Sequence, residues 1–484
     1  RAVELLSSKE KLMAGLPNFA TYFGRDMMMT ALMMRTIWTP AMSEHVIASV
    51  LRKLGPNGDV SHEEALGGQA IRENAVVYDS LVRHGRLKEA REVLANLQKT
   101  RENYHMIDDE FQLPVLVAGY LADSSVTAEQ KRAFLFDSSD GRGPRLALLL
   151  RELALVTAWT TPYVQDPRAT NLVSFPKRDA THWRSASWRD SDAGYAGGRF
   201  AMDVNAIWAP HALQSIGLIL KALDSLGLGG DRLTSFMPEI DTTSLGRYRS
   251  SPASLDSALR VWRGARRHFE VTLPPSVVRA RVNARLASLP PVERRYWRRI
   301  VGAKGAAEDS LHFLALSLDA DGKPIPVVNT DPATGLFLDG LFFESTRGDP
   351  KQVERDLSTF VLPYPAGLLV DSLGPVVAND AYASPRIWRR FQEDLYHSPR
   401  VVWGREVNLI SLGLARARGK VPDSWLARIL AAVEASGLGH NELWSYRIDG
   451  DRLRPMRYGT SSDVQLWNTT DLAVEYELAR LRDR

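Results

Sequence analysis

Hydrophobic residues recur at helical spacing along almost the whole chain, and this periodicity constrains its fold more than any other feature. The stretch Arg25–Trp38 is apolar nearly all round, which predicts a helix buried between layers. Its methionines are typical of core filling. Further helices are predicted near residues 43–53, 69–84, 87–100, 109–122, 127–136, 145–160, 205–226, 254–269, 275–288, 307–317, 350–361, 385–395, 403–418, 421–436 and 464–482.

Strand signals are sparse. The best one is Pro324–Phe343, where turn formers at Asn329–Gly335 could join two short strands. We therefore expect an all-α protein with a small β insertion around 320–345. A long series of helix pairs without a heptad seam fits either an α-solenoid or a closed double ring of helices. We favour the ring, because aromatic and acidic clusters recur at helix ends rather than along one exposed face.

The 484 residues are expected to form a single domain with a decorating insertion at about 227–345. The 61 Lys and Arg residues nearly balance the 57 Asp and Glu residues, and no basic run is interleaved with aromatics, which argues against nucleic acid as a partner. No apolar run reaches the length of a membrane span, so no membrane partner is expected. The absence of cysteine excludes disulfides and thiolate metal sites.

We expect a soluble protein, and the sequence does not distinguish a cytoplasmic from a periplasmic or secreted location. The chain begins at Arg1 rather than Met, which leaves room for a leader or a further N-terminal domain.

The segment Ser185–Pro210 places a carboxylate between aromatic residues at the entry to a helix. Asp190 follows Trp188, and Asp203 stands where N-terminal caps are favoured, with Trp208 beyond it. Aromatic planes beside carboxylates suit sugars, because a pyranose ring has an apolar face and a rim of hydroxyls. The alternative interpretation is that the tryptophans are core residues and Asp190 is a cap.

Four more clusters combine polar and aromatic residues at loop–helix junctions: Thr21–Asp26, Gly58–Glu64, Tyr104–Phe111, and His440–Tyr446 together with Ser462–Asn468. In the first, Arg25 and Asp26 could grip adjacent hydroxyls of one sugar, donor beside acceptor. In the second, His62 and Glu63 would form a polar rim. Each cluster also has a structural interpretation: an ion pair with a helix cap, a surface loop, or acids such as Asp108 that favour the helix dipole.

The clusters have neither the spacing of a metal site nor that of a nucleophile motif. The histidines occur singly, without HExxH, and the run Asp319–Gly322 lacks the later ligands of a calcium loop. There is no GxSxG, no Walker-type loop and no dinucleotide fingerprint. We therefore expect neither a metal nor an organic cofactor.

Paired carboxylates remain as the candidate chemistry. Asp190 and Glu442 are 252 positions apart, so only a closed fold could bring them together. Inverting hydrolysis of an acetal needs a protonated carboxyl at the leaving oxygen and a carboxylate that activates water, roughly 6.5–9.5 Å apart. An aromatic neighbour such as Trp188 would raise the pKa of the acid by desolvation, as general-acid work near neutral pH requires.

Together the clusters resemble the (α/α)6-barrel glycosidases, most closely the amylo-α-1,6-glucosidase domain of glycogen-debranching enzymes and its bacterial relatives. Three matches carry the resemblance. Phe23–Asp26 is similar to the family's WGRD turn, Ser187–Ser191 with Asp203–Trp208 to its TWMDS…EINALW, and Asn441–Glu442 with Val464–Trp467 to its SE…AQAW. Weaker similarities are Met106–Asp108, to T-V-D, and Tyr396–Trp403, to HNGTVW.

The resemblance covers nearly the whole chain and implies an (α/α)6 toroid of inner and outer helices. It implies that Asp190 is the general acid and Glu442 the general base. Arg25, Asp26 and Asp108 would hold the sugar in the cleavage subsite. The predicted wall and rim of the pocket comprise His62, Glu63, Trp188, Asp203, Trp208, Trp403, Trp444, Gln465 and Trp467. Relatives often carry a β-sandwich domain before the barrel, and such a domain could accompany this chain as a partner.

The sequence departs from the family's pattern at Arg189, at Asp203 and at Asn468, which leaves the sugar and the linkage open. We expect an inverting glycoside hydrolase that acts on an α-linked glucoside or a related oligosaccharide or polysaccharide. One alternative is a disaccharide phosphorylase, whose phosphate site near Glu442 would use Arg405, Arg447 or Arg452. The other is a catalytically silent sugar-binding barrel.

Overall fold

The computed structural model describes residues 2–8, 11–16, 19–65, 67–99, 101–102, 105–304, 310–341, 350–394, 396–459 and 464–482. It is 57% helical with 12% strand in six small sheets, a mixed α/β composition, so the all-α prediction is wrong. Of the clusters predicted from sequence, Tyr104, Ser462 and Asp463 lie outside the described residues.

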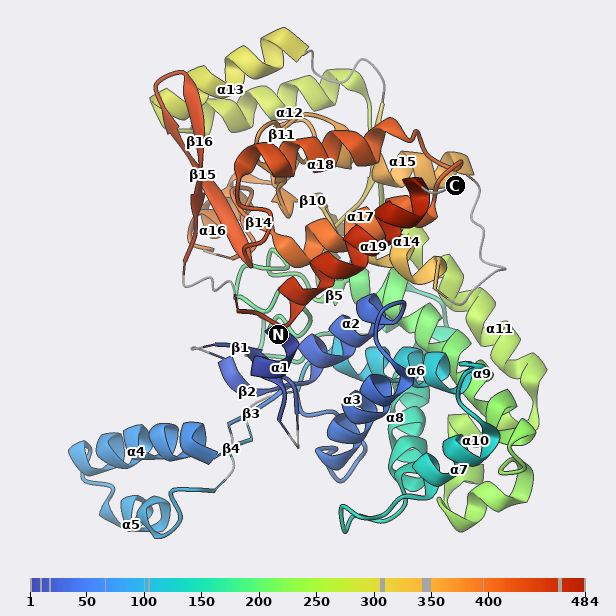
Figure 1. Cartoon of the computed structure of the whole chain (residues 1–484). Coiled ribbons are helices and arrows are strands. Elements are labelled where there is room, and N and C mark those ends of the chain that lie inside the picture. The colour runs from blue at the N-terminus through green and yellow to red at the C-terminus, as the bar shows by residue number, and fades with distance from the viewer. Residues whose placement is uncertain are drawn as a thin grey trace.

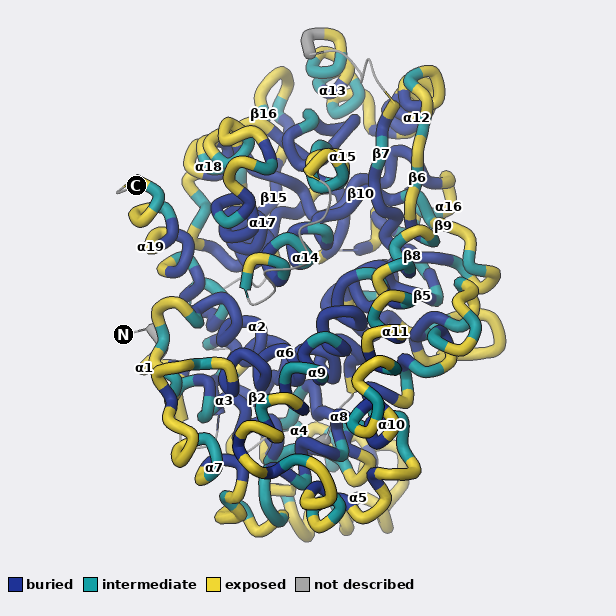
Figure 2. Tube along the Cα trace, turned by 90° about the vertical axis from the view of Figure 1, so that its right-hand side faces the viewer, coloured by how far each residue is buried: buried dark blue, intermediate teal, exposed yellow. Residues whose placement is uncertain are grey.

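Six helices surround the centre of the molecule, and each contacts the next either directly or through the turn that leads into one of them (Figures 1 and 2). Their order around the centre is α2 (Gly24–Met34), α6 (Ile107–Leu121), α9 (Ala209–Ser225), α14 (Pro332–Asp339), α17 (Gly404–Arg416) and α19 (Asp471–Arg482), which returns to α2. A π-helical turn, η2 (Asp203–Trp208), leads into α9, and a 3₁₀ turn, η6 (Trp467–Thr470), leads into α19. We call these six helices the ring.

The ring helices α2 and α6 are buried because their sequences carry apolar residues on most sides, whereas α19 is only partly buried. All residues of α2 and of α6 are buried, polar ones included. This confirms the buried helix predicted from Arg25, although α2 ends at Met34 rather than near Trp38. The polar residues lie in the first turns, where each helix begins at the end of the molecule that carries the candidate site.

A second set of helices packs around the ring. It comprises α3 (Pro40–Arg52), α8 (Arg145–Gln165), α11 (Pro252–Arg263), α15 (Pro350–Val361) and α18 (Ser424–Ser436). The remaining helices are α1 (Ala2–Leu6), α4 (Gly67–Arg83), α5 (Leu87–Ala95), α7 (Ala128–Phe136), α10 (Ser244–Ser250), α12 (Pro275–Ser288), α13 (Pro291–Lys304) and α16 (Pro385–Gln392). Of these, α4 and α5 pack on each other as a largely exposed hairpin that projects from the body (Figure 1).

Two antiparallel sheets lie where ring helices begin. One has the order β1 (Met13–Gly15), β2 (Phe19–Phe23), β3 (Glu63–Ala65) and β4 (Arg101–Glu102), and the other β14 (Val402–Trp403), β15 (Leu443–Asp449) and β16 (Arg452–Arg457). Because β2 runs directly into α2 and β14 directly into α17, the strands fix where these helices start. The short strands were not predicted, since two or three residues are too few to show alternation.

The other four sheets are smaller. One has the order β5 (Phe200–Ala201), β8 (Ser317–Leu318) and β9 (Pro324–Ile325). The other three pair β6 (Glu270–Leu273) with β7 (Leu311–Leu314), β10 (Val328–Asn329) with β13 (Ala378–Asn379), and β11 (Leu369–Val370) with β12 (Gly374–Pro375).

The predicted β insertion around 320–345 is also corrected. Strands β9 and β10 exist but do not pair with each other: β9 pairs with the preceding strand β8 and β10 with the distant strand β13, and the expected turn at Asn329–Gly335 instead starts α14. Pro332 follows Asp331 at the first helical position, where its fixed φ and missing N–H cost nothing. Residues 342–345 lie outside the described residues. The predicted decorating insertion at about 227–345 thus contains α14, a ring helix.

Within the described part of the chain, one helical segment is long and apolar enough to cross a membrane, Asp203–Ser225. It comprises η2 and α9, and 67% of its most apolar stretch is buried inside the protein, as in a core helix.

Candidate active site

A cavity of about 330 Å³ lies at the ends of the ring helices where α2, α17 and η6 begin. Ten of the fourteen site residues named from the sequence line it: Arg25, Asp26, His62, Glu63, Trp188, Asp190, Trp403, Glu442, Gln465 and Trp467. The cavity therefore gathers residues from four of the five clusters, and Asp190 and Glu442 line the same space.

Arg25 connects three elements of the site. Its Nε and Nη2 donate to both carboxylate oxygens of Asp108, at 2.6 and 3.0 Å, and Nη1 donates to Asp190 Oδ2 at 3.4 Å. Burial alone would lower the pKa of Arg25, but Asp108, Asp109 and Asp190 raise it well above its usual value. Asp108 does not line the cavity; it is buried behind Arg25 and orients the guanidinium.

Asp190 stands on a loop whose neighbouring residues are anchored on both sides. Arg189 is fully buried and donates to Asp331 Oδ1 and to the carbonyl of Val377. On the other side, Ser191 Oγ donates to Asp394 Oδ2 at 2.7 Å. The side chain of Asp190 itself is 37% exposed, so the apolar enclosure expected from Trp188 is incomplete.

Glu442 is buried and accepts a hydrogen bond from Gln465 Nε2 at 3.1 Å. Its backbone carbonyl accepts from the N–H of Gly404, which ties β15 to the start of α17. Gln465 reaches Glu442 across β1, and a Cβ at Gly15 would overlap the side-chain amide of Gln465. Glycine at this position therefore allows the contact that orients Glu442.

Asp26 and His62 line the cavity beside Arg25. Burial raises the pKa of Asp26 well above its usual value, although Arg25 and Arg405 lower it. His62 Nδ1 lies 2.7 Å from Asp109 Oδ2. Burial, reinforced by Arg25, lowers the pKa of His62 to about 3, so the imidazole is uncharged near neutral pH.

Glu63 lies on the rim of the cavity. It pairs with Phe23 across strands β2 and β3, and its Oε1 accepts from Thr21 Oγ1 at 3.4 Å. Because Glu63 is only half-buried, it can exchange hydrogen bonds with a ligand or with water.

Three tryptophans form one wall of the cavity. Trp188 and Trp467 each meet Trp403 edge to face, with ring centroids 6.1 and 6.0 Å apart. His397 stacks on Trp403 at 5.8 Å, and the guanidinium of Arg405 lies over both Trp188 and Trp467, at 4.9 and 5.5 Å. The packing holds the indole planes rigidly beside the carboxylates.

Two predicted wall residues lie elsewhere. Trp444 and Trp208 are buried in the core, and neither lines the cavity. Neighbouring residues of a strand point to opposite faces, so on β15 Leu443 lines the cavity while Trp444 points away and donates Nε1–H to the carbonyl of Leu373. Trp208 lies on η2 inside the core.

Asp203 also lies behind the cavity rather than in its wall. Its Oδ2 accepts from Ser187 Oγ at 2.6 Å and from Tyr195 OH at 2.9 Å. Burial, together with Asp331, raises the pKa of Asp203 to about 7. Asp203 therefore holds the segment that leads into Trp188 and Asp190.

Sequence reasoning missed several residues of the site. Ala14, Phe19, Phe23, Tyr396, His397 and Leu443 also line the cavity. Asp331 was missed as an anchor: its Oδ1 accepts from Trp188 Nε1 at 3.0 Å as well as from Arg189. The Asp331–Pro332 pair is a helix-start signal that could have placed Asp331 at a ring-helix entry.

No group of three or more histidine, aspartate or glutamate side chains that could hold a metal ion occurs in the described residues. At the weak calcium-like run, Asp319 Oδ1 accepts from the backbone N–H groups of Asp321 and Lys323, both at 2.9 Å, which is the pattern of a turn.

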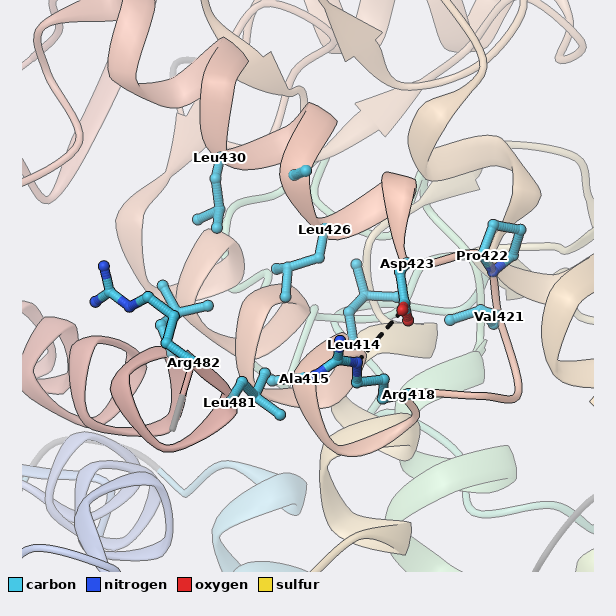
Figure 3. A pocket seen from close by; sticks show the side chains of 12 residues that line it. Leu414, Ala415, Arg418, Val421, Pro422, Asp423, Leu426, Leu430, Leu481 and Arg482 are labelled. Atoms are coloured by element: carbon cyan, nitrogen blue, oxygen red, sulfur yellow. Dashed lines mark hydrogen bonds and ion pairs between the residues drawn. The ribbon is translucent and has the colours of Figure 1, made fainter. Parts of the chain in front are cut away.

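A separate, mostly apolar cavity of about 360 Å³ lies between α17, α18 and α19 (Figure 3). Leucines such as Leu414 and Leu426 line it, and an ion pair of 3.3 Å between Arg418 and Asp423 lies at its edge. None of the residues predicted for the site lines this cavity.

No protein-family model matches the chain, and a search of curated proteins finds no significant match. The resemblance to the (α/α)6-barrel glycosidases therefore stays a prediction.

Proposed function

We propose that the protein is an inverting glycoside hydrolase that cleaves an α-glucosidic or related linkage. The observation that carries the proposal is that Asp190 and Glu442, from distant parts of the chain, line one cavity together with Trp188, Trp403 and Trp467. A volume of about 330 Å³ is at the lower end of the range of small-molecule sites and fits a single sugar ring in the innermost part.

In this proposal Asp190 donates a proton to the glycosidic oxygen as the bond to the anomeric carbon breaks. Glu442 takes a proton from the water that attacks that carbon from the opposite face. The amide hydrogen bond from Gln465 stabilises the charged carboxylate that a general base requires. A sugar in the cavity would also cover the exposed part of Asp190 and exclude water from the reacting groups.

Arg25 and Asp26 are placed to bind the hydroxyls of this sugar, since both line the cavity. The guanidinium of Arg25 donates hydrogen bonds, and the carboxyl group of Asp26 accepts them or, when protonated, donates one. The tryptophan wall would stack against the apolar face of the ring. Because Asp108 already holds two of the guanidinium nitrogens, Arg25 is pre-oriented before the substrate arrives.

The phosphorylase alternative is less well supported, because it needs a cation that faces Glu442. The residues Arg447 and Arg452 are exposed and do not line the cavity. Arg405 is buried, pairs with Glu406 at 3.2 Å and covers two tryptophan rings. Among the described residues, the arginine that lines the cavity is Arg25, which already forms an ion pair with Asp108.

The test is hydrolysis of a panel of α-linked gluco-oligosaccharides by the wild type and by Asp190→Asn and Glu442→Gln. Each variant should lose about a hundredfold to ten-thousandfold in kcat and keep its fold. Asp192→Asn and Glu434→Gln, both exposed, are the matched controls. NMR of the fresh product should show the inverted anomer.

Added phosphate should not produce a sugar 1-phosphate if the hydrolase proposal holds. Binding of an oligosaccharide without turnover on the whole panel would instead favour the silent sugar-binding protein. Near-normal turnover of either carboxylate variant on a confirmed substrate would refute its assigned role.

A further inference from the structure

A second polar cavity, of about 720 Å³, lies at the opposite end of the ring from the candidate active site. Its lining residues lie at the C-terminal ends of five ring helices. They are Arg35 and Thr36 after α2, Ala122–Ser124 after α6, Gly340 and Leu341 after α14, the last residues of α17 together with Arg418, and residues in the last turns of α19. The same helices begin at the candidate site, so the two cavities lie at opposite ends of shared elements.

Four arginines line this cavity: Arg35, Arg416, Arg418 and Arg480. Two carboxylates face them among the described residues that line it, Asp123 and Glu477. Arg418 is paired with Asp423 outside the lining, at 3.3 Å, so three arginines face the two carboxylates and the excess is one positive charge. Arginines near helix C-termini commonly cap the last carbonyls, as Arg35 Nη2 does toward Gly119 at 3.1 Å. Capping explains some of these residues but not the excess.

The two carboxylates are largely engaged. Asp123 Oδ1 accepts from the N–H and the hydroxyl of Ser125, at 2.9 and 2.7 Å. Glu477 is shared between two arginines: Arg480 Nη1 lies 3.4 Å from it and Arg416 Nη2 lies 3.9 Å from it. These separations are long for charge-assisted hydrogen bonds, so neither guanidinium is saturated by Glu477.

Arg416 is the centre of this excess. Only 14% of its side chain is exposed, and its buried Nη1 has no hydrogen-bond partner among the described residues. Burial lowers the pKa of Arg416, Glu477 raises it, and Arg35 and Arg480 lower it further. A buried guanidinium that is repelled by two others would be stabilised by an anion between them.

We propose that this cavity binds a phosphate-bearing anion. Guanidinium groups match the geometry of phosphate oxygens and bind them in a bidentate manner. The cavity is larger than a bare phosphate needs, so the class we assign is a phosphate monoester of a small metabolite, with the phosphate held by Arg416 and Arg480. The proposal of this anion site does not depend on the proposed hydrolase activity.

Titration calorimetry at low ionic strength, with inorganic phosphate and with a hexose 6-phosphate as probes, tests the proposal. Saturable binding of either probe is expected, together with a rise in Tm, because a ligand that binds the folded state stabilises it. Arg480→Gln should weaken the affinity by about tenfold or more, as loss of a charged hydrogen bond does. Arg480 is 44% exposed in its side chain, so this variant should fold.

Arg482→Gln is the matched control, since Arg482 lies on the same helix but lines the apolar cavity instead. Trp467→Ala, at the other end of the ring, should leave the affinity for the probe unchanged and so exclude binding at the candidate active site. The proposal is overturned if neither probe binds saturably, or if Arg480→Gln and Arg482→Gln bind it equally well. The arginines would then serve only as helix caps and ion-pair partners.

Discussion

Arg25 at the start of α2 and Asp108 at the start of α6 form a two-bond ion pair, with Nε 2.6 Å from Oδ2 and Nη2 3.0 Å from Oδ1. Only 3% of the Arg25 side chain and 1% of the Asp108 side chain are exposed. Because the third nitrogen of Arg25 faces Asp190, this pair joins two ring helices to the loop that carries the proposed acid.

Arg25→Gln should lower the free energy of unfolding by about 3–5 kcal/mol, because it leaves Asp108 buried without its cation. Urea unfolding measures the loss, and adding Asp108→Asn to the same chain should recover part of it. As a control, Arg86→Gln breaks an exposed ion pair with Glu89 and should leave the unfolding midpoint unchanged. A loss no larger than that of the control would contradict the role given to the pair.

Gly15→Ala should lower kcat by about tenfold or more, because the new Cβ overlaps the Gln465 amide and displaces it from Glu442. The measurement is kcat on a substrate that the wild type hydrolyses, with Tm recorded alongside. Gly302→Ala is the control, since a Cβ there meets nothing within 4 Å. Unchanged kcat in Gly15→Ala would show that Gln465 does not orient the base.

Asp203→Asn should flatten the dependence of stability on pH. Burial raises the pKa of Asp203 from 3.8 to about 7, so the folded protein holds a proton there that the unfolded chain has lost. The unfolding free energy therefore falls as pH rises between about 4 and 7, by about 1.4 kcal/mol for each unit of pKa shift. Urea unfolding across this range should show a shallower fall for Asp203→Asn than for the wild type.

The control for that experiment is Asp192→Asn, which changes an exposed carboxylate that pairs with Arg178 and should keep the wild-type slope. Equal slopes in Asp203→Asn and in the wild type would mean that Asp203 is already ionised throughout this range.

Alanine substitutions of two tryptophans with similar sequence surroundings should have different effects, one on stability and the other on oligosaccharide binding. Trp208→Ala should cost about 3–5 kcal/mol of stability, because it opens a cavity in the core. Trp467→Ala should cost less and instead weaken oligosaccharide binding, since Trp467 lines the candidate site and is only half-buried. Urea unfolding and calorimetry with an oligosaccharide separate the two effects. Loss of binding in a folded Trp208→Ala alone would reverse the assignment.

Much of the helical framework could be predicted from the sequence. The predicted range at 109–122 falls on α6, the one at 403–418 on α17 and the one at 421–436 on α18. In these long helices apolar residues recur at helical spacing over several turns, so many residues support the same prediction. The helix α14 was missed, since its eight residues follow Asp331–Pro332 in a stretch rich in turn formers.

The strands could not be predicted in the same way. β14 is only two residues long, and β15 is buried along most of its length and shows no clear alternation. Their pairing depends on segments far apart in the chain, such as Trp403 opposite Leu443. Local pattern contains no information on such pairs, and for this reason the all-α prediction failed.

The sequence by itself determined most of the long helices and that acids, an arginine and aromatics gather near their beginnings, because capping and periodicity are local properties. Only the tertiary structure decided that Trp403 and Trp467 line a cavity while Trp208 and Trp444 are core, since composition does not say which way a side chain points. It also decided that Asp190 and Glu442 share one cavity and that four arginines share another, because both depend on how the ring helices meet in space.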